Sequence, residues 1–297
     1  RLLLKKGYKI SGSDITDSSE LRKLRKDGAR VFIGHSKENI KDANLVVVVS
    51  SAIDKKNPEL IYSKKNSITV IPRAEMLGSI MIGYESIAIA GSHGKTTTTS
   101  MIAKILSVAN LSPTYVVGGK ILSTDENSDL GEGKYIVAEA DESDGTFVHI
   151  QPDVAVLTNI DDDHLVHYKN IFENLLESFV MFSENVPFYG YLMINGDDKN
   201  IKKISKRIYR TKITFGESKS CNYQINNIVP NAGKQSFEIY DKKNNKNYKF
   251  KINLPGKHNV FNAAASIGVA MEEGISIGSI KKGILSFSGV ERRYEKH

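Results

Sequence analysis

The stretch Ser86-Ile-Ala-Ile-Ala-Gly-Ser-His-Gly-Lys-Thr-Thr-Thr-Thr99 decides how this chain folds. Its apolar run over residues 87–90 predicts a buried strand, and a turn bounded by Gly91 and Gly94 follows. After the turn, apolar residues recur every three or four positions along one face, which predicts a helix that begins at Lys95. A strand, a glycine-bounded turn and a helix in this order are typical of the sites that hold nucleotide phosphates.

The turn and the start of the helix have the composition of a phosphate-binding loop. The residues that we predict to bind the nucleotide are Gly91, Ser92, His93, Gly94, Lys95, Thr96 and Thr97. Backbone N–H groups would face the phosphates, Lys95 would reach the β- and γ-oxygens, and the Thr96 hydroxyl would meet Mg²⁺. The usual spacing G-x-x-x-x-G-K-[ST] is not met, because Ile89 stands where the first glycine belongs. The alternative is a Gly-Lys-Thr turn that only caps an ordinary α/β helix.

Composition narrows the class of protein. The 297 residues are enough for two domains, and 40% apolar with 25% charged residues is typical of a globular protein. The longest apolar run, residues 45–49, suits a strand and predicts no membrane insertion. The net charge of +7 comes from dispersed lysines without interleaved aromatic residues, so we expect no nucleic-acid partner. A single cysteine, Cys221, excludes an internal disulfide and fits the reducing cytoplasm.

The first part of the chain reads as alternating strands and helices. Predicted strands at residues 8–14, 29–33, 45–49 and 69–71 indicate a parallel sheet that binds ligands at its carboxyl edge. Asp14, at the end of the first strand, meets a ribose hydroxyl or caps the following helix. The chain opens at Arg1 inside a predicted helix, so we expect a missing N-terminal segment. We place the domain boundary after Gly83, which gives domains at residues 1–83 and 84–297.

Carboxylates close two predicted strands of the second domain. One strand ends in Glu139, a position where phosphate-loop enzymes hold Mg²⁺ directly or through water. The next strand leads into three aspartates and His164, an oxygen-rich group that suits Mg²⁺ or Mn²⁺ more than zinc. The alternative is a loop of solvated acids. We favour that alternative for Asp162 and a metal-ligand role for Glu139 and His164.

The last third of the chain adds three predictions. Residues 236–240 and 248–252 alternate polar and apolar and predict a small antiparallel hairpin beside the main sheet, whereas residues 124–133 predict a loop. Asn259 and Asn262 precede a predicted helix at 263–271, where they cap the helix or present amides to a base or sugar. The pair Arg292-Arg293 offers two guanidinium groups to transferring phosphates.

Taken together and in this order, the motifs resemble those of the Mur ligase family. The segments that carry the resemblance are Gly34-His35, Ser50-Ser-Ala52, Arg73-Ala-Glu-Met-Leu77, Gly91-Ser-His-Gly-Lys-Thr-Thr-Thr98, Glu139-Ala-Asp-Glu-Ser-Asp144, Thr158-Asn-Ile-Asp161, Asp163-His164, Pro187-Phe-Tyr-Gly190, Gly256-Lys-His-Asn-Val260, Asn262-Ala263, Phe287, Gly289-Val290 and Arg292-Arg293. The resemblance implies an α/β fold: a partial Rossmann-like UDP-binding domain, then a P-loop ATPase domain with a mainly parallel sheet and a small antiparallel sheet. A third, amino-acid-binding domain is expected to be absent from this chain.

The resemblance also implies a reaction and its residues. Within the family the chain is most similar to members that use ATP and Mg²⁺ to join L-alanine to the carboxylate of UDP-N-acetylmuramate, through an acyl phosphate, for peptidoglycan synthesis in the cytoplasm. It implies that Lys95 meets the β- and γ-phosphates, that Thr96 and Glu139 hold one Mg²⁺, and that His164 holds a second. Asn262 would hold the adenine, and Arg292 or Arg293 a phosphate. The implied candidates for the UDP-sugar are Asp14, His35, Ser50 and Arg73.

Three positions bear on the subtype. Phe179 stands where several sister ligases carry a carbamoylated lysine, which the alanine-adding members also lack. Ser143 stands where ligases that add a recycled tripeptide to UDP-N-acetylmuramate typically have tyrosine, so that activity ranks second. Residues 165–167 depart from the family's usual Met-Asp-Thr, which leaves their roles open. A nucleotide-binding module without turnover is the non-enzymatic alternative, and it would have no need to keep Glu139 and His164.

Overall fold

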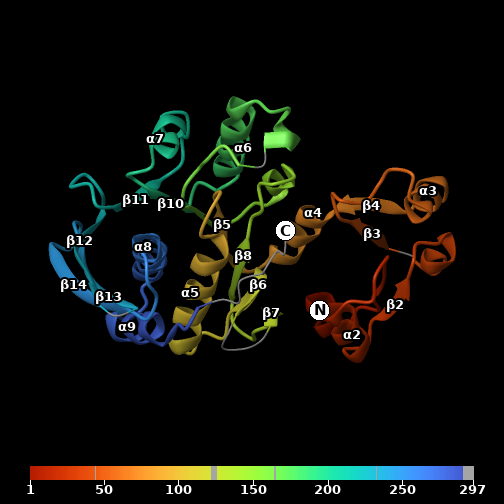
Figure 1. Cartoon of the computed structure of the whole chain (residues 1–297), viewed down its shortest axis with the longest axis horizontal. Helices are drawn as coiled ribbons and strands as arrows, with labels where there is room; N and C mark the ends of the chain where they lie inside the picture. Colours follow the sequence, from red (N-terminus) through yellow and green to blue (C-terminus); the bar gives the residue numbers. More distant parts are fainter. Residues whose placement is uncertain (44, 122–125, 164, 232, 290–297) are drawn as a thin grey trace. The chain divides into compact units, whose positions relative to one another are not determined.

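A computed structural model describes residues 1–43, 45–121, 126–163, 165–231 and 233–289 (Figure 1). The chain divides into two compact units, which we call unit 1 (Arg1–Ser79) and unit 2 (Ile80–His297). Within the described ranges, no helix is both long and apolar enough to cross a membrane.

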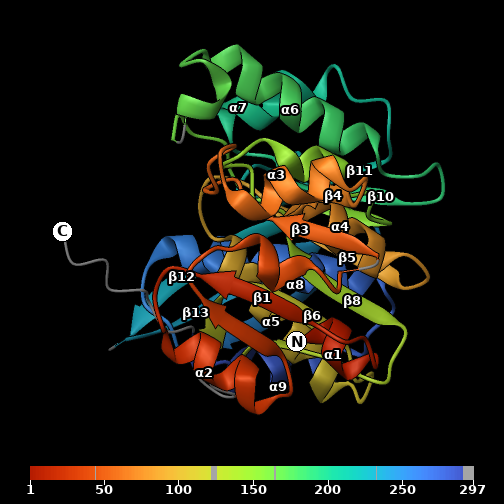
Figure 2. The ribbon, with the colours of Figure 1, turned by 90° about the vertical axis from the view of Figure 1, so that its right-hand side faces the viewer.

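Unit 1 contains two pairs of parallel strands. Strand β1 (Ser11–Asp14) pairs with β2 (Arg30–Ile33), and β3 (Val46–Val49) pairs with β4 (Thr69–Pro72). Figure 2 shows β3 and β4 side by side, with α3 close to them. The helices of unit 1 are α1 (Leu2–Lys5), α2 (Ser19–Lys26), η1 (Lys37–Ile40) and α3 (Pro58–Lys65), and α4 (Arg73–Met81) begins in unit 1 and ends in unit 2. The parallel pairing was predicted, but the strands form two separate pairs instead of one sheet.

Two helices of unit 1 begin at residues that suit a helix N-terminus. The Ser18 side chain caps α2 by accepting a hydrogen bond from the Leu21 N–H, as a serine in this position commonly does. Helix α3 follows Asn57, whose side chain accepts from the Glu59 N–H, and Pro58 occupies its first turn. The sequence predicts a helix over residues 19–27, which α2 matches closely, whereas α3 was not predicted.

Unit 2 is built on one ten-stranded sheet in the order β14-β13-β12-β11-β10-β9-β5-β8-β6-β7. Its strands are β5 (Glu85–Ala90), β6 (Thr114–Ile121), β7 (Glu126–Asp129), β8 (Tyr135–Glu139), β9 (Val154–Leu157), β10 (Tyr191–Asn195), β11 (Lys212–Gly216), β12 (Tyr223–Asn231), β13 (Lys234–Asp241) and β14 (Lys246–Ile252). Seven neighbouring strands of the sheet, β12-β11-β10-β9-β5-β8-β6 in spatial order, run parallel, so their carboxyl ends lie at one edge. That edge is where ligands are expected in such a sheet.

The antiparallel strands differ from the prediction in two ways. The predicted hairpin exists as β13 and β14, but it continues the large sheet through β12 instead of forming a sheet of its own. The predicted loop at residues 124–133 is wrong in part, because β7 lies within it and pairs antiparallel with β6. The polar composition of β7 concealed it, since an edge strand needs backbone pairing and little apolar surface.

Helices cover both faces of this sheet. They are α5 (Lys95–Val108), η2 (Thr146–His149), η3 (Leu165–Tyr168), α6 (Phe172–Glu184), α7 (Lys199–Ser205), α8 (Lys257–Glu272) and α9 (Ile277–Ser286). Helices α5, α8 and α9 contact one another, and Figure 1 shows α6 and α7 on the opposite side of the sheet. Helix α8 begins at Lys257, earlier than the predicted 263.

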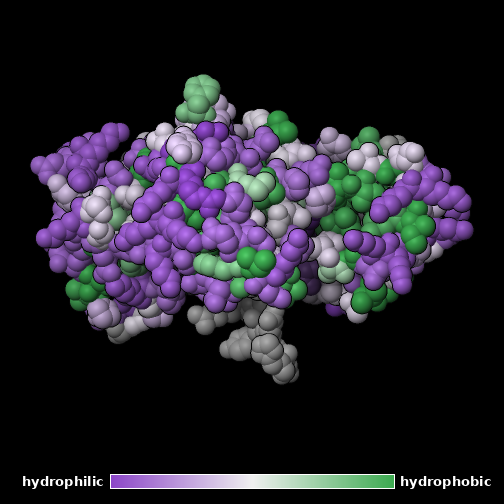
Figure 3. Space-filling view, turned by 90° about the horizontal axis from the view of Figure 1, so that it is seen from above, coloured by the Kyte–Doolittle hydropathy of each residue, from purple (hydrophilic) through white to green (hydrophobic). Residues whose placement is uncertain are grey.

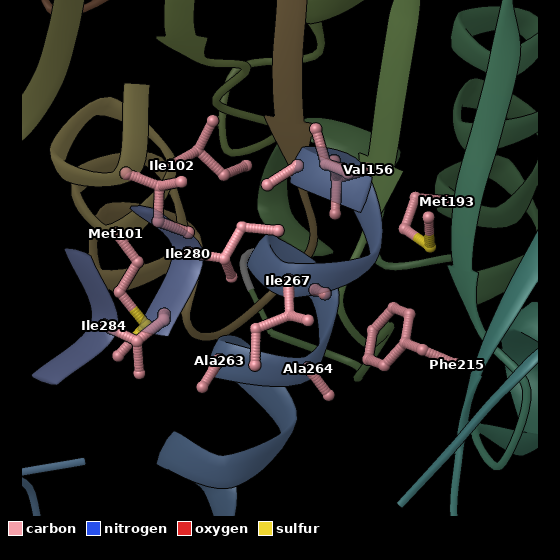
Figure 4. Packing of buried hydrophobic residues seen from close by; sticks show 14 of the residues in the cluster. Met101, Ile102, Val156, Met193, Phe215, Ala263, Ala264, Ile267, Ile280 and Ile284 are labelled. Atoms are coloured by element: carbon pink, nitrogen blue, oxygen red, sulfur yellow. The ribbon is translucent and has the colours of Figure 1, made fainter. Parts of the chain in front are cut away.

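The core of unit 2 lies between the sheet and helices α5, α8 and α9. Figure 4 shows Met101 and Ile102 of α5 beside Ile280 and Ile284 of α9, with Phe215 of β11 next to α8. Phe179 of α6 is fully buried and makes an edge-to-face contact with Phe147 at 5.2 Å between ring centroids. The face seen in Figure 3 is mainly hydrophilic, with hydrophobic residues in small groups.

Candidate functional site

The predicted phosphate loop connects β5 to α5 at the carboxyl edge of the parallel strands. Gly94 precedes α5 with φ of +82°, and Gly91 has φ of +136°, both in the region that favours glycine. A Cβ atom on Gly91 would lie 2.2 Å from the Thr158 hydroxyl oxygen, and one on Gly94 would lie 2.4 Å from the Asn262 side-chain oxygen. Both glycines are therefore required by close approach as well as by backbone conformation.

Residues that follow β9 hold the loop from the side. The His93 N–H donates to Asn159 Oδ1 at 2.9 Å. In return, Asn159 Nδ2 and Thr158 Oγ1 donate to the His93 carbonyl at 2.9 and 2.7 Å. These bonds join the loop backbone to the segment after β9 and thereby fix the conformation of the loop.

Lys95 lies at the first turn of α5 and points back into the loop. Its Nζ donates to the Gly91 carbonyl at 2.7 Å and lies 3.0 and 2.8 Å from the two carboxylate oxygens of Glu142. Glu142 is 1% exposed. Burial raises the pKa of the Glu142 carboxyl, and the charge of Lys95 acts in the opposite direction. Lys95 is thus held at the loop by an acid that the sequence analysis did not single out.

Thr96 and Glu139, the predicted ligands of one Mg²⁺, lie together. Glu139 at the end of β8 accepts a hydrogen bond from the Gly118 N–H at 2.5 Å, and the Thr96 hydroxyl lies nearby. Burial raises the pKa of the Glu139 carboxyl, and these two groups and Lys95 act to lower it. Its Oε1 atom is buried without a hydrogen-bond partner among the described residues. A hydroxyl beside a carboxylate with a spare oxygen fits Mg²⁺, which prefers hard oxygen ligands.

The aspartates after β9 contact the loop histidine. His93 Nε2 lies 3.1 Å from Asp163 Oδ2 and 3.5 Å from Asp161 Oδ2, and all three side chains are about half exposed. Within the described ranges, no group of three or more histidine, cysteine or acidic side chains is placed to hold a metal ion. His164, the predicted ligand of a second Mg²⁺, lies outside the described residues, so its role stays a prediction.

A cavity of about 370 Å³ opens beside the loop. The residues that line it are His93, Gly94, Thr158, Asn159, Asn195, Phe215, His258, Phe261 and Asn262. Aromatic rings and amide groups suit a planar heterocycle that also forms hydrogen bonds. A nucleotide with its phosphates in the loop would therefore find space for its base here.

Asn262 lies on this cavity and within α8, not at its N-cap. The residue at the N-cap is Gly256, and the Asn259 amide donates to the Pro255 carbonyl at 2.6 Å. The Asn262 amide lies 3.5 Å from Asn259 Oδ1, a long contact that leaves it available to a ligand. Of the two roles left open by the sequence, presentation of an amide is the one that fits Asn262.

The candidate UDP-sugar residues lie in unit 1. His35 Nδ1 is 2.9 Å from the Ser13 hydroxyl, which donates to Glu59 at 2.7 Å. Asp14 and Ser50 each accept a hydrogen bond from a backbone N–H two residues further along, so their side chains shape the turns after β1 and β3. Arg73 is the first residue of α4. No sugar site is assembled by these contacts alone, and the four assignments stay predictions.

Several residues of the site were not identified individually from the sequence. Glu142, Thr158, Asn159 and His258 lie inside motifs that carried the family resemblance, so a signal for them was present. Phe215 and Asn195 have no local signal, because they come from strands whose ends meet the loop only after folding. Arg292 and Arg293 lie outside the described residues.

Comparison with known proteins gives consistent matches over nearly the whole chain. Residues 1–85 match the profile "Mur ligase family, catalytic domain", and residues 89–270 match "Mur ligase middle domain". The UDP-N-acetylmuramate–L-alanine ligases of Psychrobacter sp. (strain PRwf-1) and Ruthia magnifica subsp. Calyptogena magnifica are 43% and 44% identical over 98% of this chain. The chain spans 60% and 62% of their respective lengths.

Solved structures agree with the fold. The crystal structure of the UDP-N-acetylmuramate–alanine ligase from Thermotoga maritima has a TM-score of 0.84 and 27% identity, covering 98% of this chain and 65% of that one. The UDP-N-acetylmuramate:L-alanyl-γ-D-glutamyl-meso-diaminopimelate ligase from Neisseria meningitidis has a TM-score of 0.87 and 24% identity, covering 97% and 93%. At that identity the second match bears on the fold alone.

Proposed function

The chain belongs to the Mur ligase family, and we propose that it carries the ATP-binding and phosphoryl-transfer part of a ligase that joins L-alanine to UDP-N-acetylmuramate. The observation that carries the proposal is the phosphate loop, where Lys95, Thr96 and Glu139 lie beside a cavity that fits a base. The 43–44% identity to alanine-adding ligases supports the choice of amino acid.

A carboxylate is a poor electrophile, so the reaction needs activation. In the first step a carboxylate oxygen of the muramyl group forms a bond to the γ-phosphorus, the bond from that phosphorus to the β-γ bridging oxygen breaks, and ADP leaves. In the second step the alanine nitrogen bonds to the acyl carbon, the carbon–oxygen bond to phosphate breaks, and the amine proton passes to solvent. The protein contributes mainly position and charge neutralisation.

Each residue of the site has a proposed part in these steps. The loop N–H groups and Lys95 hold the phosphates where negative charge develops. Thr96 and Glu139 would hold one Mg²⁺ and His164 a second, and ions bound there would supply positive charge beside the phosphates. The Asn262 amide orients the adenine. Arg292 or Arg293 contacts a phosphate.

We assign the nucleotide-sugar to unit 1. The candidates are Asp14, His35, Ser50 and Arg73. Among them, the His35 ring is held by contacts with Ser13 and Glu59. The two domains would comprise residues 1–83 and 84–297. The chain would act in the cytoplasm, where ATP and the nucleotide-sugar are available. Cell shape and division would then depend on it through wall synthesis.

The test is ADP release by the full-length protein with UDP-N-acetylmuramate, MgATP and one of two acceptors. L-alanine should drive ADP release, and the tripeptide L-alanyl-γ-D-glutamyl-meso-diaminopimelate should not. Lys95→Ala should slow the reaction by about a hundredfold or more, as removal of one transition-state contact does. Release with the tripeptide alone would assign the recycling activity. Tight MgATP binding without release under either condition would identify a non-catalytic nucleotide-binding module.

A further inference from the structure

The reaction described above makes no use of Glu142, although this is the most buried carboxylate at the loop. Glu142 lies three residues after Glu139, its side chain is 1% exposed, and both its oxygens face Lys95 Nζ at 2.8 and 3.0 Å. A buried carboxylate is costly unless a cation and hydrogen bonds compensate it. Lys95 supplies a positive charge that opposes the effect of burial, whereas Asp141 adds a negative charge nearby.

The backbone under Glu142 is fixed by neighbouring segments. The Tyr168 hydroxyl of η3 donates to the Glu142 carbonyl at 2.5 Å, and the Gly145 N–H donates to the same oxygen at 3.0 Å. Gly145 has φ of +70°, and a Cβ atom there would lie 3.1 Å from the His167 ring. These hydrogen bonds fix the backbone of the turn that carries the Glu142 carboxylate toward the loop.

These contacts determine what Lys95 can do. An ammonium group has three N–H donors. The Gly91 carbonyl takes one and the Glu142 carboxylate at least one more, and the Ser92 carbonyl lies 3.5 Å from Nζ, so that at most one donor, now in long contact with Ser92, can turn to a phosphate oxygen. A long, flexible side chain is thereby held in one orientation before any nucleotide arrives, which is the condition for effective charge stabilisation.

We infer that Glu142 is a positioning residue, which anchors the Lys95 ammonium at the mouth of the phosphate loop so that its remaining donor faces the transferring phosphate. This inference rests on the proposed function, because it assigns Lys95 to phosphoryl transfer. It predicts that Glu142 affects turnover more than nucleotide affinity, since affinity comes largely from the loop N–H groups that Glu142 does not touch.

The first experiment tests the pair by thermal melting of this chain. Lys95→Met should lower the melting temperature because it leaves the buried Glu142 charge unpaired. The double variant Lys95→Met/Glu142→Gln should recover most of that loss. The matched control is the exposed pair Lys203–Glu173, 2.6 Å apart, where Lys203→Met should change little and Glu173→Gln should rescue nothing. Absence of rescue at Glu142 would overturn the pairing.

The second experiment measures turnover in the full-length protein and MgATP affinity in parallel. Glu142→Ala should lower kcat by about tenfold to a hundredfold, the usual effect of a misplaced catalytic group, with KM for ATP nearly unchanged. Glu142→Gln, which keeps one acceptor for Lys95, should fall between Glu142→Ala and the parent. A merely structural role would lower stability and raise KM together. If Lys95→Ala is inactive while Glu142→Ala has the activity of the parent, the positioning role of Glu142 is wrong and the proposed function stands. If Lys95→Ala is fully active, the proposed function is wrong.

Discussion

At the scale of single residues, Gly94 shows how little freedom the phosphate loop has. It combines φ of +82° with a virtual Cβ position 2.4 Å from the Asn262 side-chain oxygen, so one methyl group would meet the residue proposed to orient the adenine. Glycine is required here for two reasons: the positive φ disfavours any residue with a Cβ atom, and a Cβ atom would clash with Asn262.

Gly94→Ala should therefore weaken MgATP binding by about tenfold or more, since the strain of a left-handed alanine, about 1–2 kcal/mol, adds to the displacement of Asn262. The matched control is Gly233→Ala, which has φ of +80° and no atom within 4 Å of the added methyl group. Calorimetry gives the MgATP affinity of both variants. Equal MgATP affinity in the two variants would contradict a close Gly94–Asn262 approach.

The residues that could be predicted from sequence are those that sit next to one another along the chain. Lys95 and Thr96 follow a glycine turn at a helix start, and Glu139 ends an apolar strand, so local pattern was sufficient. Phe215 reaches the site from β11, and only the strand order brings it there. Glu142 follows β8 within a recognisable motif, but its contact with Lys95 depends on the pairing of β5 with β8. His93 was predicted as a loop residue, but its contacts with Asp161 and Asp163 depend on how two strand ends meet.

At the scale of elements, the C-terminus of α8 is locked to the sheet by tyrosines. Tyr135 of β8 and Tyr191 of β10 donate to the two oxygens of Glu273 at 3.0 and 2.9 Å. Tyr223 of β12 donates to Glu272 at 2.5 Å. Acidic residues are unfavourable at a helix C-terminus, so these hydrogen bonds offset a repulsion as well as joining helix to strands.

Glu273→Gln should lower the free energy of unfolding by about 1–3 kcal/mol, because an amide offers one acceptor where two phenols need one each. Urea unfolding of this chain measures the change. Glu177→Gln, at an exposed site on α6 that pairs with Arg207, is the control and should change little. A Glu273 variant as stable as the Glu177 variant would show that the lock is not formed.

The same lock makes the protein sensitive to alkali. Burial, then the charge of Glu273, raises the pKa of Tyr191 well above its ordinary value of about 10. Above that ordinary value the unfolded chain loses the phenol proton while the folded chain keeps it, so the unfolding free energy should fall as pH rises from about 10. Tyr191→Phe should make that fall shallower in urea titrations at pH 8 to 11. An unchanged pH dependence would argue against a buried, neutral Tyr191.

Elements with a strong periodic pattern were predicted, and those defined by pairing were not. Helix α5 and strands β5, β8 and β9 follow their apolar patterns closely. Strand β7 is polar and is defined by its backbone pairing with β6. Helix α9 packs through Gly283, whose added Cβ would lie 2.8 Å from Ile105 Cα, a contact that no local pattern indicates.

At the scale of the whole molecule, the nucleotide site belongs to unit 2. The loop, the Thr96–Glu139 pair and the lining of the cavity all lie after residue 80 and rest on one continuous core. Residues 80–297 produced alone should therefore fold and bind MgATP with a Kd within about threefold of the whole chain. Calorimetry on both proteins gives the comparison. Loss of binding in a folded unit 2 would mean that unit 1 supplies part of the site.

The central claim is that the loop of unit 2 drives amide formation by transferring the γ-phosphate to the muramyl carboxylate. Its most direct test uses UDP-N-acetylmuramate labelled with ¹⁸O in that carboxylate, with MgATP, L-alanine and the full-length protein. Mass spectrometry of the released inorganic phosphate should find one labelled oxygen per turnover, and Lys95→Ala should release almost none. Phosphate released without the label, alongside amide formation, would contradict an acyl phosphate and the function proposed for this loop.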